Sequence, residues 1–206
     1  MVKDIAKANY HIKDLWFPRT KKDPTCRVTS ELTDRYNCIA WAMRFTDRWV
    51  QPSRGAGYWW PKYNPTSIYF DVSQNGLIKA FYRLGFRICD NNDKEFFYDK
   101  VALYYNPRTK MWTHAARVIN NKEYHSKAGG GWDFHHGSEI NRLENPADPQ
   151  NDYGVVYKIM KRHKFMRIYS YLLMFGRLIQ KCVADPIRIP IHFFDLIKDC
   201  VVLILH

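Results

Sequence analysis

The chain has 206 residues, of which 46% are hydrophobic and 16% aromatic, enough for one well-cored domain with an appendage. This composition excludes a disordered chain. The 32 Lys and Arg residues against 20 Asp and Glu give a formal net charge of +12, which favours anionic partners such as nucleic acid, an acidic membrane surface or an anionic cell-wall polymer.

The five cysteines stand at positions 26, 38, 89, 182 and 200 and form no C-x-x-C pair. An odd and scattered set argues against a disulfide framework and against a structural zinc ribbon. The first residues contain no apolar h-region, so we expect synthesis in the cytoplasm without an ordinary signal peptide. Any action outside the cell would then require a specialised secretion system.

The N-terminal part of the chain predicts an arm followed by a helix. Residues 1–30 are polar and basic and are interrupted by Pro18 and Pro24, which indicates an irregular arm packed onto the domain. After a run of N-capping residue types, apolar residues recur at helical spacing from Cys38. We therefore expect a helix from Cys38 to about Val50.

Cys38 would occupy the first turn of that helix. A helix N-terminus carries a partial positive charge, which favours a thiolate over a thiol and makes Cys38 a candidate nucleophile. The alternative is that Cys38 is a small buried hydrophobe, as most unpaired cysteines are.

The next two segments predict a loop and a second helix. Residues 51–66 are rich in Gly, Pro and aromatic residues, and Trp59 and Trp60 either form one wall of a substrate cleft or plug the core. Apolar residues at helical spacing predict a helix from Ser73 to Leu84, with Gly85 as its C-terminal cap.

Three short runs at close spacing then predict an antiparallel meander, namely Val101–Tyr105, Met111–Ile119 and Glu123–Lys127. His114 and His125 would lie on adjacent strands joined by a tight turn, near enough for one imidazole to orient the other. The alternative for His125 is a surface histidine on a hairpin.

Two more histidines, His135 and His136, follow a run of three glycines, and Tyr153–Tyr157 predicts the last strand of the domain. A metal site that combined these histidines with Cys38 has no H-E-x-x-H or comparable spacing, so we expect no metal.

From Lys158 the chain becomes strongly basic, with nine Lys or Arg residues against three Asp, or +6. Apolar residues keep helical spacing on both sides of Pro186 and Pro190, which predicts a basic amphipathic helical hairpin over residues 158–206. Charged residues interrupt it too often for a membrane span. It would pack on the domain or on a partner, or lie on an anionic membrane.

A helix that carries the nucleophile, followed by a meander that carries histidine, resembles the papain-like thiol hydrolases, and specifically the NlpC-type branch. These bacterial enzymes cut the peptide stems of peptidoglycan. Their aromatic-Asp-Cys motif is similar to residues 36–38, and their His-Val/Ala-Gly/Ala strand is similar to residues 114–116. Their third polar residue comes about a dozen positions later, where His125 stands.

The chain also resembles a little-characterised bacterial group with matching motifs at residues 37–42, 59–61, 113–117 and 126–129. It departs from the NlpC pattern in two places. Asn37 replaces the usual aspartate, and no Ser-Gly follows the cysteine.

The resemblance implies acyl transfer without a metal or organic cofactor. Cys38 would be the nucleophile, His114 its base, and His125 the residue that holds the imidazole, with Ser126 and His136 as alternatives for this third role. The backbone N–H of Cys38 would stabilise the oxyanion.

Four further residues complete the expected site: Tyr36 and Asn37 beside the oxyanion, and Trp59 and Trp60 along the substrate cleft. The expected fold is α+β and papain-like, with the nucleophile helix packed on an antiparallel sheet. The hydrolase domain would span residues 31–157, between the arm of residues 1–30 and the helical hairpin of residues 158–206.

We therefore expect a cysteine peptidase or amidase that cleaves amide bonds in peptidoglycan stem peptides. The missing signal peptide favours an antibacterial effector toxin delivered to a target-cell periplasm, with an immunity protein as a partner. Two alternatives remain: a thiol hydrolase that acts on a target-cell protein or lipid ester at an anionic membrane, and a non-enzymatic basic binding module. No recognisable motif supports specific nucleic-acid binding.

Overall fold

The computed structural model describes residues 4–52, 58–61, 71–139, 142–149 and 152–167. The chain divides into two units, Met1–Arg162 and His163–His206. Only residues 163–167 of the second unit are described, so the fold below is that of the first.

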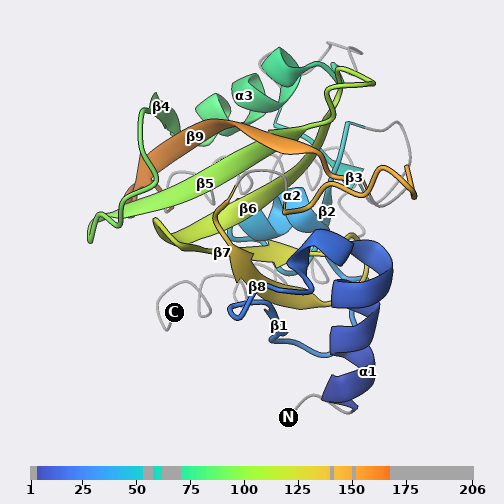
Figure 1. The fold of residues 1–206 in the computed structure, drawn as a ribbon. Helices are drawn as coiled ribbons and strands as arrows, with labels where there is room; N and C mark the ends of the chain where they lie inside the picture. The colour runs from blue at the N-terminus through green and yellow to red at the C-terminus, as the bar shows by residue number, and fades with distance from the viewer. Residues whose placement is uncertain (1–3, 53–57, 62–70, 140–141, 150–151, 168–206) are drawn as a thin grey trace, which may run out of the picture. The chain divides into compact units, whose positions relative to one another are not determined.

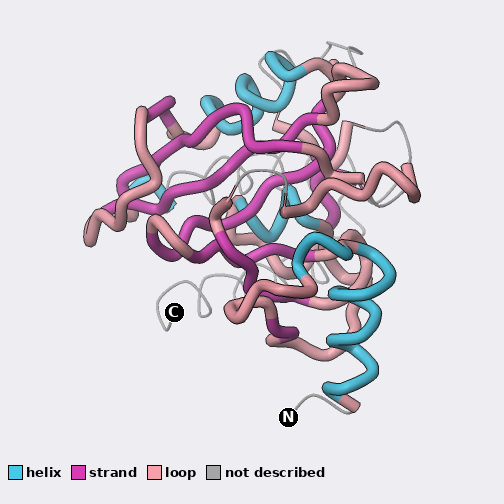
Figure 2. Tube along the Cα trace, viewed as in Figure 1, coloured by secondary structure: helices cyan, strands magenta, loops and turns pink. Residues whose placement is uncertain are grey.

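The main element of this unit is a seven-stranded sheet, which with its helices gives the expected α+β class (Figures 1 and 2). In their order across the sheet the strands are β1 (Arg27–Val28), β8 (Asp133–Gly137), β7 (Glu123–Lys127), β6 (Trp112–Asn120), β5 (Tyr98–Tyr105), β9 (Val155–His163) and β4 (Arg87–Cys89). The consecutive strands β5, β6, β7 and β8 pair antiparallel with their neighbours. The predicted meander is therefore confirmed.

The nucleophile helix is shorter than its sequence spacing predicts. Helix α2 covers only Cys38–Ala42, and Trp49–Val50 form strand β2, which pairs in parallel with β3 (Tyr58–Trp59). The helix ends because Arg44 adopts a left-handed conformation, with φ at 75°. The N–H groups of Arg44 and Phe45 then bond back to the carbonyls of Trp41 and Ala40, a Schellman ending.

Helix α3 (Gln74–Arg83) matches its prediction closely. The Ser73 side chain accepts the N–H of Gly76 as an N-cap, and Gly85 has a φ of 85° just after the helix. The buried face includes Leu77 and Phe81, which are fully sealed from solvent.

The N-terminal arm is helical rather than irregular, so that prediction is wrong. It forms α1 (Ile5–Tyr10), a π-helical segment η1 (His11–Trp16) and a 3-10 turn η2 (Pro18–Thr20). Its apolar side chains are Ala8, Ile12 and Phe17, and these join a buried cluster with Ala102, Tyr104, Ala116, Tyr124 and Phe134 of the sheet. Tertiary burial stabilises this short helical stretch, whose polar sequence gives only a weak helical signal.

Strand β9 continues through residues 158–163, which were assigned to the helical extension. The boundary between units therefore lies after Arg162 and not after Tyr157. The predicted hairpin falls mainly in residues 168–206, outside the described residues. Among the residues that are described, no helix is long and apolar enough to cross a membrane.

The two faces of the sheet carry different partners. Alternation along β6 places Ala115 and Arg117 on the face that contacts α2, because Arg117 donates from Nε to the carbonyl of Trp41 at 2.7 Å. His114 and Ala116 point to the opposite face, where Ala116 packs with the N-terminal arm. We call these the α2 face and the arm face.

Candidate functional site

Cys38 is the first residue of α2, and Asn37 fixes its position. The Oδ1 atom of Asn37 accepts the N–H of Ala40 at 3.0 Å, and its Nδ2 atom donates to the carbonyl of Val50 at 3.0 Å. One side chain thus caps the helix and ties it to β2. Asn37 is committed to this structural role.

The sulfur of Cys38 lies among backbone donors in a buried position. The N–H groups of Ala115, Ile39 and Cys38 itself favour its charged form, and so does the charge of Lys127. Desolvation outweighs all of them and raises the pKa of Cys38 to about 11. The thiolate expected from the helix end is therefore not favoured in this closed arrangement.

His114 is fully buried on the arm face. Its Nε2 atom lies 2.9 Å from Oγ of Ser126, and its ring stacks on Tyr153 with centroids 4.3 Å apart. Burial holds the pKa of His114 well below its usual value, so the imidazole is neutral. A neutral imidazole can accept a proton.

Ser126 continues this contact to a second buried imidazole. Its Oγ lies 2.7 Å from Nε2 of His136, and Nδ1 of His136 lies 2.8 Å from the carbonyl oxygen of Gly137. Because a carbonyl only accepts, Nδ1 of His136 carries the proton. Burial lowers the pKa of His136 to about 4, so its Nε2 is an acceptor for the Ser126 hydroxyl.

This chain of bonds fixes the tautomer of His114. With the Ser126 proton directed at His136, Oγ accepts a proton from Nε2 of His114, which leaves Nδ1 of His114 unprotonated. That Nδ1 atom is buried and has no hydrogen-bond partner. The relay of His114, Ser126 and His136 therefore presents one bare basic nitrogen.

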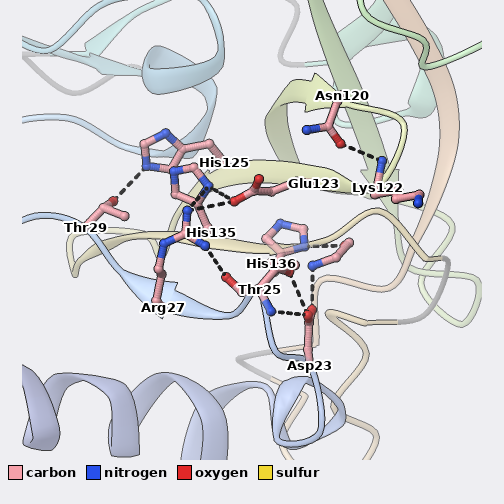
Figure 3. A network of polar contacts seen from close by, with 11 residues as sticks. Asp23, Thr25, Arg27, Thr29, Asn120, Lys122, Glu123, His125, His135 and His136 are labelled. Atoms are coloured by element: carbon pink, nitrogen blue, oxygen red, sulfur yellow. Dashed lines mark hydrogen bonds and ion pairs between the residues drawn. The ribbon is translucent and has the colours of Figure 1, made fainter.

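His125 does not take the third position that we expected. Arg117 opposes His125 and Val118 opposes Tyr124, so residues of the same parity share a face, and His125 faces away from His114. The Nε2 atom of His125 lies 2.8 Å from Oγ1 of Thr29 (Figure 3). Counting residues from the turn gave the right neighbourhood but not the parity, and Ser126 holds the imidazole instead.

The expected cleft residues have mixed outcomes. The Tyr36 hydroxyl donates to Oδ2 of Asp133 at 2.7 Å, so it is committed elsewhere than to an oxyanion. Trp60 stacks on Trp112 with centroids 5.8 Å apart. The backbone of Trp59 belongs to β3, whereas its side chain and most of the aromatic loop lie outside what the structure describes.

Two residues that the sequence reading did not single out border the site. Tyr153 stacks on His114 and interacts electrostatically with Cys38. Lys127 is fully buried, and its Nζ donates to the carbonyls of Thr33, at 2.6 Å, and Gly131. A lysine inside a strand next to a glycine-rich turn is the one sequence signal that could have revealed Lys127.

The structure brings Cys38 and His114 into the same neighbourhood without bonding them. The N–H that meets the sulfur belongs to Ala115, the residue after His114, and Tyr153 touches the environment of both. No hydrogen bond joins the sulfur to the imidazole, although both residues are described. Within the described residues, no cluster of three or more His, Cys, Asp or Glu could hold a metal ion.

Comparison with known proteins gives one match. The model of a family described as a domain of unknown function (DUF7689) matches residues 27–161, which run from β1 into β9. No curated protein and no solved structure matches the chain.

Proposed function

The chain belongs to the DUF7689 family, and we propose that it is a cysteine hydrolase that cleaves amide bonds by acyl transfer. The observation that carries the proposal is the bare Nδ1 of His114, held by a buried relay one residue before the N–H that meets the Cys38 sulfur. A nucleophile, a base and a group that orients the base are the parts such chemistry needs.

In the proposed reaction, Nδ1 of His114 takes the proton of the Cys38 thiol, and the sulfur attacks the amide carbonyl. The N–H of Cys38, at the start of α2, stabilises the oxyanion. The His114 imidazolium, held at Nε2 by Ser126, then protonates the leaving amine. Water hydrolyses the thioester with His114 as base, which restores the thiol.

The closed arrangement implies a specific order of events. A thiol whose pKa is about 11 beside a neutral imidazole is a pair without charge, so the proton moves only when substrate binding brings sulfur and Nδ1 together. Catalytic bonds that are long in a free enzyme and shorten in the complex are common in this class of site. Tyr153, stacked on His114, is the side chain that has to shift.

We propose peptidoglycan stem peptides as the substrate, as in the papain-like NlpC enzymes that the motifs around Cys38 and His114 resemble. The net charge of +12 supports this choice, because it favours association with an anionic wall polymer. Export as an antibacterial effector with a cognate immunity protein belongs to the same proposal.

Digestion of purified cell wall tests the proposal. The wild-type chain should release fragments with new amine termini, detected by mass spectrometry. Cys38→Ser should abolish them, and Ser126→Ala should lower the rate by at least tenfold through loss of the His114 orientation. Cys89→Ser, a matched change of a thiol on β4, should leave the rate unchanged.

Two results separate the substrate from the chemistry. If the wall stays intact while generic peptide or thioester substrates are cleaved in a Cys38-dependent way, the substrate is wrong and the hydrolase stands. If nothing is cleaved and Cys38→Ser changes no measured property, the hydrolase proposal is refuted.

A further inference from the structure

Arg117 lies on the α2 face in an unusual electrostatic position. Its guanidinium stacks 3.4 Å from the centre of the Trp41 ring, and its Nε donates to the Trp41 carbonyl. The residue is only 9% exposed. No carboxylate of the described residues lies within ion-pair distance of it, since Asp99 contacts Arg44 and Arg162 instead. Burying a cation without a paired anion is costly.

The fork of Arg117 remains available. Its two terminal nitrogens make no hydrogen bond with the described part of the chain, and neither is among the sealed polar atoms that lack a partner. Stacking on Trp41 fixes the plane of the group in advance, and a planar fork matches a carboxylate or phosphate bidentately.

Arg44 places a second positive charge beside the first. It stands at the left-handed position that ends α2, where glycine is the usual residue because a side chain is strained there. Its charge also lowers the pKa of Arg117, after the larger effect of burial. Closing the helix accounts for the backbone of Arg44, and capping Trp41 accounts for Nε of Arg117. Neither role requires two guanidinium groups next to each other.

We propose that the terminal nitrogens of Arg117, with Arg44 beside them, bind an oxyanion on the α2 face, either a carboxylate or a phosphate group. Trp41, half-buried, forms the floor of this site. The site is defined by these side chains alone and does not depend on the chemistry of Cys38.

Its distance from Cys38 would give the site a role in specificity, and this step rests on the proposed function. Arg117 follows Ala115 by two residues along β6, which is about 7 Å of strand. The N–H of Ala115 meets the Cys38 sulfur. A substrate cleaved at Cys38 would therefore carry an acidic group close to its scissile amide.

Binding measurements on full-length Cys38→Ser protein test the site independently of hydrolysis. The probes are N-acetylglycine, its neutral counterpart N-acetylglycinamide, and inorganic phosphate, each titrated while the side-chain Nε–H resonance of Arg117 is followed by NMR. We expect saturable shifts with N-acetylglycine, with phosphate, or with both, and none with the amide. The response to each acid shows which oxyanion the site takes.

Arg44→Gly is the decisive variant, because glycine suits the left-handed backbone. It should leave the melting temperature equal or higher while it weakens oxyanion binding at least fivefold. Arg117→Lys, which removes the fork, should abolish bidentate binding. Lys79→Gln, which removes one exposed charge on α3, should change the affinity less than twofold.

The proposal is overturned if neither acid shifts the resonance, if the amide binds as well as the acid, or if Arg44→Gly and Lys79→Gln have the same effect. Loss of hydrolysis with intact oxyanion binding would refute only the proposed function. Hydrolysis without oxyanion binding would refute only this site.

Discussion

Cys38 shows how two effects at one residue oppose each other. Three backbone N–H groups and the charge of Lys127 stabilise a thiolate, and removal from water destabilises it. The second effect is larger, so the helix end that points to a nucleophile in the sequence does not activate it in the closed fold.

The alkylation of Cys38 should therefore be slow and strongly dependent on pH. With a pKa of about 11, only about one thiol in ten thousand is ionised at pH 7. We expect the iodoacetamide rate at Cys38 to rise about tenfold per pH unit between pH 7 and 10, measured by mass spectrometry. Cys89, which is half-buried, serves as the internal reference. A rate that levels off below pH 9 would contradict the raised pKa.

Ser126 should contribute to stability as well as to the site. Ser126→Ala leaves Nε2 of His114 and Nε2 of His136 buried without a partner, at a cost of about 1–3 kcal/mol for each unsatisfied group. Urea unfolding should show a loss of about 2–4 kcal/mol. Ser138→Ala, at a half-buried hydroxyl, should change stability by about 0.5 kcal/mol or less. Equal losses in the two variants would argue against the relay.

At the scale of single elements, α2 is held mainly by what flanks it. Five residues are too few for a helix to be stable alone, so the Asn37 cap, the Schellman ending at Arg44 and packing on β6 and β7 maintain it. The position where related motifs carry aspartate has asparagine here for a visible reason. Only an amide can both accept from Ala40 and donate to Val50.

Asn37→Asp should accordingly destabilise the fold. The carboxylate keeps the acceptor but loses the donor, so the carbonyl of Val50 is left without its side-chain partner, at a cost of about 1–3 kcal/mol. Asn37→Ala, which also loses the cap, should be less stable still. Chemical denaturation compares the three proteins. An aspartate variant as stable as the wild type would show that the donor at Nδ2 is dispensable.

The sequence predicted those elements whose signals are local. The meander from β5 to β7 and helix α3 follow from alternation, a tight turn, a serine cap and a glycine ending. The end of α2 was missed because an arginine, not a glycine, adopts the left-handed conformation there. Phe45 is buried as part of that ending and so imitates a continued helical face.

The candidate site was predictable only in part, for a related reason. Cys38 and His114 stand out by residue type and local context, whereas the partner of His114 depends on strand parity and on contacts across the sheet. Tyr153, more than thirty positions after His114, is brought to its ring only by the fold. Single-sequence patterns carry no information on such a pairing.

At the scale of the whole molecule, buried neutral histidines should make the fold sensitive to acid. Burial lowers the pKa of His136 to about 4 and that of His125 to about 3, and it lowers that of His114 as well. The unfolded chain binds these protons near pH 6.5, so it holds more protons than the native state below that pH. Stability is therefore lost as pH falls from about 6.5 toward 4.

Acid unfolding measures this effect directly. His136 alone should contribute a loss of about 3 kcal/mol between pH 6.5 and 4, followed by urea titrations across that range. His136→Asn should have lower stability at pH 7 but a shallower dependence on pH. Asp23 and Glu95, whose pKa values are lowered, add further losses only below about pH 4. A level stability between pH 6.5 and 5 would contradict buried neutral histidines.

The N–H of Ala115 is directed at the sulfur of Cys38, and this has a consequence for observing the protein at work. Any acyl group, alkylating reagent or oxidant that occupies the sulfur replaces the acceptor of that amide. Its ¹⁵N resonance is thus a built-in reporter, which reads the chemical state of the thiol from a backbone position in the middle of the sheet. Such a signal needs no labelled substrate and no knowledge of which amide the protein cleaves.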